Sequence, residues 1–209
     1  YILLNLPGVY LPGVHVTFID SLFTAVSAVS VTGLSTISIG GTYTTFGLVM
    51  LMLVLQLGGI GIMSLGTFFW LLIKKRIGLR ERQLIMVDHN QYSLQGVVHL
   101  IQEIIKIIFV IELTGGLILS IYLKQFYATW NEAFLHGMFM AVSATTNAGF
   151  DITEASLMPY FGDYFVQTIV MILIVLGAIG FPVLIEVKSF VKRRNDKVRF
   201  RFSLFTKIT

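Results

Sequence analysis

The chain has 209 residues, of which 56% are apolar and only 12% charged, and its formal net charge is +4. This composition excludes an ordinary soluble domain, and the absence of cysteine excludes disulfides and thiolate metal sites. The sequence contains no acid–base pair, nucleophile triad or phosphate-binding loop, so no enzyme is predicted.

Long uncharged stretches follow one another along the chain. Residues 21–73 contain no Asp, Glu, Lys, Arg or His, and residues 164–185 contain none either. A third apolar stretch, 93–123, is interrupted by three charged side chains. Since about 20 helical residues cross a bilayer core, each stretch is long enough to span. The stretches lack the alternation of barrel strands, so they predict an all-α membrane protein.

Two sequence elements occur twice. The stretch AVSAVSVTGL at 25–34 returns as AVSATTNAGF at 141–150, with five of ten positions identical. Further on, LGGIG at 57–61 matches LGAIG at 176–180. The repeated unit is therefore a short helix, a glycine turn, a loop and a long helix with a glycine-rich break.

The first repeat is expected at 1–76, with an incomplete opening helix. It comprises a short pore helix at about 18–30, a glycine turn at 30–34 and a long helix at 46–73. The short helix extends roughly 20 Å at 1.5 Å per residue. Because this cannot cross a core of about 30 Å, we expect the helix to enter the membrane and turn back. A cytosolic connector is expected at 77–92.

The second repeat is expected at 93–190, and a basic cytosolic segment leading toward a further helix at 191–209. This repeat comprises a helix at 93–123, a pore helix at about 131–145, a glycine turn at 146–150 and a long helix at 163–187. Bends are expected at the glycine-rich breaks, where the small residues also permit close helix packing. The break residues are Gly58, Gly59, Gly61, Gly177, Gly180 and Pro182.

The basic residues predict the orientation in the membrane. Thirteen of the fifteen Lys and Arg residues lie in two clusters, at 74–82 and 188–207, whereas 5–46 and 125–165 contain none. Short basic loops remain in the cytoplasm, so both glycine turns are expected outside, at the cell membrane. The clustering argues against nucleic-acid binding. A docking surface for a cytosolic partner or anionic lipid is an alternative role for the clusters.

The glycine turns predict a cation site. Irregular backbone at membrane depth must be buried or line water, and its carbonyl oxygens can replace an ion's hydration shell. Glycine tolerates positive φ, and the C-terminal end of the short helix adds a negative dipole end. A plain helix C-cap is the alternative. The expected potassium-binding filter residues are Ser30, Val31, Thr32, Gly33, Leu34, Thr146, Asn147, Ala148, Gly149 and Phe150.

Other polar and aromatic residues have narrower expected roles. Glu112 lies deep in the stretch 93–123, where a carboxylate is costly. We expect a structural hydrogen bond to a neighbouring helix, with a role in the ion path as the alternative. Tyr43, Tyr127, Trp130 and Tyr160 are expected to form an aromatic belt at the outer interface.

The paired turns resemble a known family. SVTGL at 30–34 and TTNAGFD at 145–151 are similar to the first and second filter segments of the Trk/Ktr/HKT potassium transporters. The tail RFRFSLFTK at 199–207 is most similar to the membrane subunits of bacterial Ktr systems.

The resemblance implies four helix–pore loop–helix repeats around one pore, with one filter glycine in each repeat, here Gly33 and Gly149. It also implies K⁺ transport, with Na⁺ as a coupling ion in some members, a homodimer, and regulation by a cytosolic nucleotide-binding ring. Because two filter segments are present, we expect a piece of a longer chain that lacks two repeats.

Two other functions remain open. One is a carrier that moves another small solute through discontinuous helices. The other is a membrane scaffold in which the small residues serve only packing. Such carriers often contain inverted repeats, whereas both glycine turns here are expected on the same side.

Overall fold

The computed structural model describes residues 1–61, 97–192, 202 and 204–208, and within these ranges the chain is helical, with no strand. A single isolated bridge in this part of the chain pairs Tyr10 with Tyr43. The elements are η1 (Ile2–Asn5), α1 (Phe18–Val29), α2 (Ile39–Thr42), α3 (Thr45–Gly59), α6 (Val97–Leu123), α7 (Trp130–Thr145), η2 (Met158–Tyr160), α8 (Tyr164–Ala178), α9 (Phe181–Lys192) and α10 (Leu204–Ile208).

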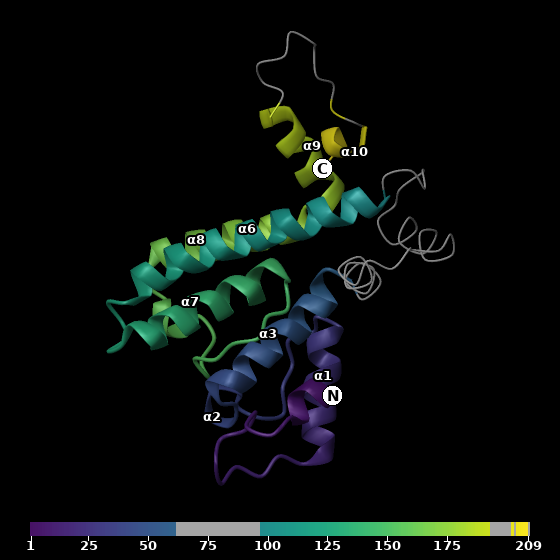
Figure 1. The fold of residues 1–209 in the computed structure, drawn as a ribbon. Helices are drawn as coiled ribbons and strands as arrows, with labels where there is room; N and C mark the ends of the chain where they lie inside the picture. Colours follow the sequence, from purple (N-terminus) through teal and green to yellow (C-terminus); the bar gives the residue numbers. More distant parts are fainter. Residues whose placement is uncertain (62–96, 193–201, 203, 209) are drawn as a thin grey trace.

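Helices α1 and α3 pack side by side and organise the first half of the chain (Figure 1). The side chain of Thr17 caps α1 by accepting a hydrogen bond from the backbone N–H of Asp20. The N-terminal residues fold against the start of α3, where the N–H of Thr44 donates to the carbonyl of Val9 at 2.9 Å. Leu4 and Val9 are fully buried there, so the opening residues belong to the core of this half.

Helices α6, α7 and α8 form the second half. Helix α6 has 27 residues, or roughly 40 Å at 1.5 Å per residue, and α8 runs alongside it (Figure 1). Helix α7 packs against both and begins with a capping box formed by Thr129 and Glu132. Gly137 of α7 lies so close to Ser120 of α6 that a Cβ would clash. Small residues thus bring these two helices into close contact.

The lengths of the helices separate spanning from short elements. Among the described residues, Ile101–Leu123 is the one helix long and apolar enough to cross a membrane unaided. Tyr164–Ala178 and Pro182–Phe190 meet the same criterion only together and are bent by 105°. Helix α1 has 12 residues, or about 18 Å. It is too short to cross a hydrocarbon core of about 30 Å.

Helices α3 and α8 end at corresponding glycines. Gly61 follows α3 with a φ of +91°, and Gly180 follows α8 with a φ of +93°. A residue with positive φ commonly ends a helix, and glycine adopts this conformation without steric cost. The single helix expected at 163–187 is therefore divided into α8 and α9. Pro182 lies in the first turn of α9, where proline is tolerated.

Several sequence expectations fall outside the described residues. They are the end of the helix expected at 46–73, the basic cluster at 74–82 and the connector at 77–92, which overlaps that cluster. Most of the segment 191–209 is also outside, and the helix expected from residue 93 is described from Val97 onward.

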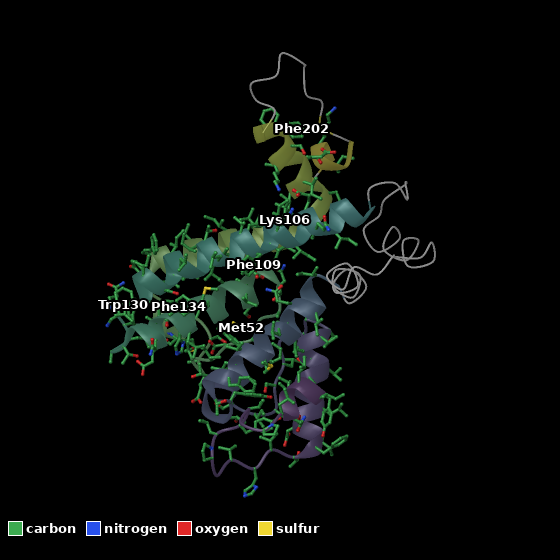
Figure 2. All side chains as sticks on the ribbon, in the orientation of Figure 1. Met52, Lys106, Phe109, Trp130, Phe134 and Phe202 are labelled. Atoms are coloured by element: carbon green, nitrogen blue, oxygen red, sulfur yellow. The ribbon has the colours of Figure 1, made fainter. Side chains whose placement is uncertain are left out.

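The predicted aromatic belt is wrong for two of its four members. Tyr43 and Tyr160 are each only 2% exposed, because a position near a helix end does not decide which way a ring points. The hydroxyls of Tyr127 and Tyr160 are 2.7 Å apart, and burial raises the pKa of both phenols. Trp130 is exposed at one end of the α6–α7 pair, and Lys106 lies toward the other end of α6 (Figure 2).

Candidate functional site

The first glycine segment, residues 30–34, folds back onto the end of α1. The N–H groups of Ser30 and Thr32 donate to carbonyls of the last turn of α1, at 2.8 and 2.9 Å. The N–H of Leu34 donates to the hydroxyl of Ser27 at 2.9 Å. The segment's amide protons thus point toward the helix that precedes it.

The second glycine segment, residues 146–150, repeats this arrangement at the end of α7. The N–H groups of Thr146 and Ala148 donate to carbonyls of the last turn of α7, each at 3.0 Å. The hydroxyl of Ser143, the counterpart of Ser27, donates to the carbonyl of Phe150 at 2.7 Å. In both segments, therefore, a serine of the short helix secures the far end of the turn.

The two segments also share their backbone conformation. Gly33 and Gly149 have φ angles of +78° and +72°, as the sequence led us to expect for these positions. Val31 and Asn147 both have φ of +56°, which was not predicted. Asn147 carried a signal, since asparagine is enriched among residues with positive φ, but Val31 carried none.

The carbonyl oxygens of the first four residues of each segment differ from the amide groups in their hydrogen bonding. Within the described residues, no hydrogen bond is donated to the carbonyls of 30–33 or 146–149. Several residues of the two segments are exposed, among them Ser30, Thr32 and Asn147. Carbonyl oxygens without a protein donor can bind water or a cation.

The two segments lie directly beside one another. A Cβ on Gly33 would collide with the carbonyl oxygen of Ala148, and a Cβ on Gly149 would come within 3.9 Å of the Cα of Gly33. The loops that follow also meet, because the hydroxyl of Ser38 donates to the carboxylate of Glu154. Two stretches separated by 116 positions thus form one continuous patch of backbone.

The electrostatic character of this patch comes from the backbone. Its ten residues carry no charged side chain, and the described part of the chain contains no cluster of three or more metal-ligating side chains. Helices α1 and α7 both lead into the patch with their C-terminal ends (Figure 1). The negative ends of the helix dipoles therefore favour a cation there.

The glycines of the long helices have two separate roles. A Cβ on Gly58 would collide with the carbonyl of Val29, and a Cβ on Gly177 would collide with the carbonyl of Thr145. Val29 and Thr145 are the last residues of α1 and α7, so α3 contacts the end of α1 and α8 contacts the end of α7. These two glycines permit close packing, whereas Gly61 and Gly180 end the helices.

Gly59 and Glu112 connect the two halves. A Cβ on Gly59 would lie 2.7 Å from the Cβ of Thr146, so α3 also touches the start of the second glycine segment. Glu112 of α6 is buried, accepts a hydrogen bond from the amide of Gln56 of α3, and has its Oε1 3.0 Å from the hydroxyl oxygen of Thr145. Glu112 thus contacts the residue that precedes the second glycine segment and is not itself part of the segment.

Comparison with known proteins identifies the family. A family model described as TrkH, cation transport protein, matches residues 5–209. The chain belongs to this family. The Trk/Ktr assignment made from the two glycine segments is confirmed by this match.

Named relatives point the same way. The chain is 56% identical over 208 residues to the Ktr system potassium uptake protein D of Bacillus subtilis (strain 168), covering 100% of this chain and 46% of the relative. It is 39% identical over 192 residues to the Ktr system potassium uptake protein B of the same strain, covering 92% and 42%. It is 33% identical over 189 residues to the potassium/sodium uptake protein NtpJ of Enterococcus hirae, covering 90% and 42%. The chain spans less than half the length of these relatives.

Proposed function

We propose that this chain forms part of the pore of a potassium-uptake protein, in which backbone carbonyls of the two glycine segments coordinate K⁺. The observation that carries the proposal is the matched geometry of the two segments. Their amide protons bond back to the short helices, and their carbonyls have no protein donor among the described residues. Neutral carbonyl oxygens in such an array can replace the hydration shell of K⁺.

The short helices support a pore-loop arrangement. Helix α1 cannot cross the membrane, and the long helix α3 returns beside it. We infer that α1 and α7 are re-entrant pore helices and that both glycine segments face the outside. The absence of Lys and Arg from 5–46 and 125–165 supports this orientation.

Further glycine segments around the same axis would let carbonyl oxygens from several segments coordinate one K⁺ together. Leu51 and Leu55 of α3 share a buried cluster with Phe139 of α7, so the second pore helix covers the first long helix. The corresponding residues of α8, Val170 and Ile174, line a cavity of about 300 Å³. We infer that a further pore helix covers this face, and the resemblance implies four repeats in all.

The wider assembly belongs to the same proposal. The family resemblance supports a membrane homodimer with a cytosolic nucleotide-binding ring, and the basic segments support contact with a cytosolic partner. The resemblance also implies Na⁺ as a coupling ion in some members, and one relative is named for potassium and sodium uptake.

Replacing Gly33 with serine tests the filter. The side chain would collide with Ala148 and force a non-glycine residue to a φ of +78°. Strain of this kind costs about 1–3 kcal/mol, so we expect the K⁺/Na⁺ uptake ratio to fall about tenfold. The measurement is ion uptake by the intact transporter in cells that lack their own potassium uptake.

Gly162→Ser is the matched control, since Gly162 has open space around its Cα and no positive φ. It is expected to leave the ratio unchanged. An unchanged ratio for Gly33→Ser would remove Gly33 from the filter. Failure of the unaltered transporter to restore K⁺-dependent growth, despite membrane insertion, would refute the proposed function.

A further inference from the structure

Glu112 is the centre of a buried polar group behind the second glycine segment. It is 4% exposed and contacts side chains from two other helices. The amide nitrogen of Gln56 on α3 donates to its Oε2, and the hydroxyl oxygen of Thr145 on α7 lies 3.0 Å from its Oε1. One carboxyl group thus joins α3, α6 and α7.

The hydrogen-bond geometry indicates where the protons are. The hydroxyl oxygen of Thr145 lies 2.7 Å from the carbonyl oxygen of Ala141, closer than to Glu112. A threonine hydroxyl has a single proton, and the carbonyl of Ala141 takes it at the shorter distance. The contact between Thr145 and Glu112 then brings two acceptors together unless Glu112 supplies a proton. A protonated Glu112 completes a chain from Glu112 to Thr145 to Ala141.

The surroundings of Glu112 also favour its protonated form. In the described part of the chain, the ion pairs of α6 are made by Glu103, with Lys106 and Lys188, and none reaches Glu112. The Oε1 of Gln56 is buried without a hydrogen-bond partner, so acceptors already outnumber donors there. A carboxylate buried at membrane depth without a cation is costly, whereas a carboxylic acid adds a donor.

This polar group is connected to the start of the second glycine segment. Thr145 directly precedes that segment, and its carbonyl is held against Gly177. The next residue, Thr146, packs against Gly59 of the same helix as Gln56. In the first repeat the position of Thr145 is taken by Val29, which has no hydroxyl. A hydrogen bond of the kind that joins Thr145 to Glu112 is therefore possible at the second glycine segment and not at the first.

We propose that Glu112 is a positioning residue that stays protonated and, by donating to Thr145 while accepting from Gln56, fixes the second glycine segment in its ion-selecting geometry. The inference rests on the proposed function, because it assigns the segment to a filter. It differs from a role in the ion path, in which a charged Glu112 would face the permeating cation.

Two substitutions at position 112 separate these roles. In Glu112→Gln the amide donates to Thr145 and its oxygen accepts from Gln56, as the carboxylic acid does. We expect the K⁺/Na⁺ uptake ratio of the intact transporter to be unchanged. In Glu112→Leu both bonds are lost and the amide of Gln56 loses its partner, so we expect the ratio to fall about tenfold.

A second variant and a spectroscopic measurement keep the test decisive if Glu112→Leu does not fold. Thr145→Val removes the hydroxyl while preserving shape, and we expect the same fall in the ratio. The infrared spectrum of the purified transporter should contain a protonated-carboxyl C=O band that is absent from Glu112→Gln. Glu103→Gln, on the same helix but at a partly exposed ion pair, is the matched control and should retain that band and the ratio.

The possible outcomes are distinct. A fall in the ratio for Glu112→Gln equal to that for the leucine variant, or absence of the C=O band, would overturn the protonated state. An unchanged ratio in both Thr145→Val and a folded Glu112→Leu would overturn the positioning role. If the unaltered transporter took up no K⁺, the proposed function itself would fail. The uptake of the unaltered transporter is the reference for every variant, so this failure is distinguished from a failure of the role assigned to Glu112.

Discussion

At the scale of single residues, the second position of each glycine segment shows how differently two side chains tolerate one backbone conformation. Val31 and Asn147 share a φ of +56°. Asparagine is often found in this region, whereas a β-branched residue there is an outlier held by its surroundings. The first segment therefore contains strain that the second does not.

Val31→Asn is expected to stabilise the transporter by about 1 kcal/mol, the order of the left-handed backbone penalty for a residue with a branched side chain. Val31 is only half-buried, so little packing is lost. Asn147→Val is the reciprocal control and should destabilise by a similar amount. Thermal unfolding of the detergent-solubilised transporter measures both. A lower unfolding temperature for Val31→Asn would show that packing of the valine outweighs the strain.

Individual residues differ in how far their sequence context predicts them. Gly33 and Gly149 were predictable, because an identical glycine after two similar helices indicates a conserved conformation within one chain. Val31 was not, since valine favours extended backbone and nothing in the local sequence signals a positive φ. The role of Glu112 was predicted only as a hydrogen bond to a neighbouring helix; its partners depend on the packing of three helices.

At the scale of elements, α3 and α8 each approach the end of a pore helix closely at one glycine. The Cβ of an alanine at Gly58 or Gly177 would meet a backbone carbonyl, of Val29 or Thr145, which cannot rotate away. We expect Gly58→Ala and Gly177→Ala each to displace the long helix from its pore helix and to reduce K⁺ uptake at least about tenfold, as overpacking of about 1–3 kcal/mol implies. Uptake is normalised to the amount of protein in the membrane.

Gly115→Ala is the comparison variant for these substitutions. The three atoms nearest to its Cβ would all belong to the Leu173 side chain, which unlike a backbone carbonyl can change its rotamer. We expect uptake close to that of the unaltered transporter. Equal losses of K⁺ uptake in the Gly58, Gly115 and Gly177 variants would mean that any added methyl group disturbs these helices. The contacts with the pore-helix ends would then have no special importance.

The positions of the helices could largely be predicted from the sequence, but the geometry of the bends between them could not. Helix α1 is observed at Phe18–Val29 and α7 at Trp130–Thr145, beside expected ranges of about 18–30 and 131–145. The glycines and Pro182 predicted a break but not the angle of 105° between the helix segments on either side of it. Nor did the local sequence indicate that Lys188 of α9 forms an ion pair with Glu103 of α6.

At the scale of the whole molecule, the two halves are related in sequence and joined through their glycine segments. The internal repeat was predictable from the paired motifs. Their lateral contact was not, since nothing local indicates that Gly33 lies against Ala148. The contact is not symmetrical: a Cβ on Gly33 would collide with the second segment, whereas among the described residues a Cβ on Gly149 would meet nothing closer than the Cα of Gly33.

Comparing Gly33→Ala with Gly149→Ala in the intact transporter tests whether further segments complete the pore. Among the described residues, a Cβ on Gly33 meets the carbonyl of Ala148, whereas one on Gly149 meets nothing closer than 3.9 Å. If a third segment lies beside the second as the second lies beside the first, both substitutions collide with a carbonyl. The K⁺/Na⁺ uptake ratio should then fall equally, by about tenfold. A clearly smaller effect at Gly149 would reflect backbone strain alone, and the pore would have to close without a third segment in that position.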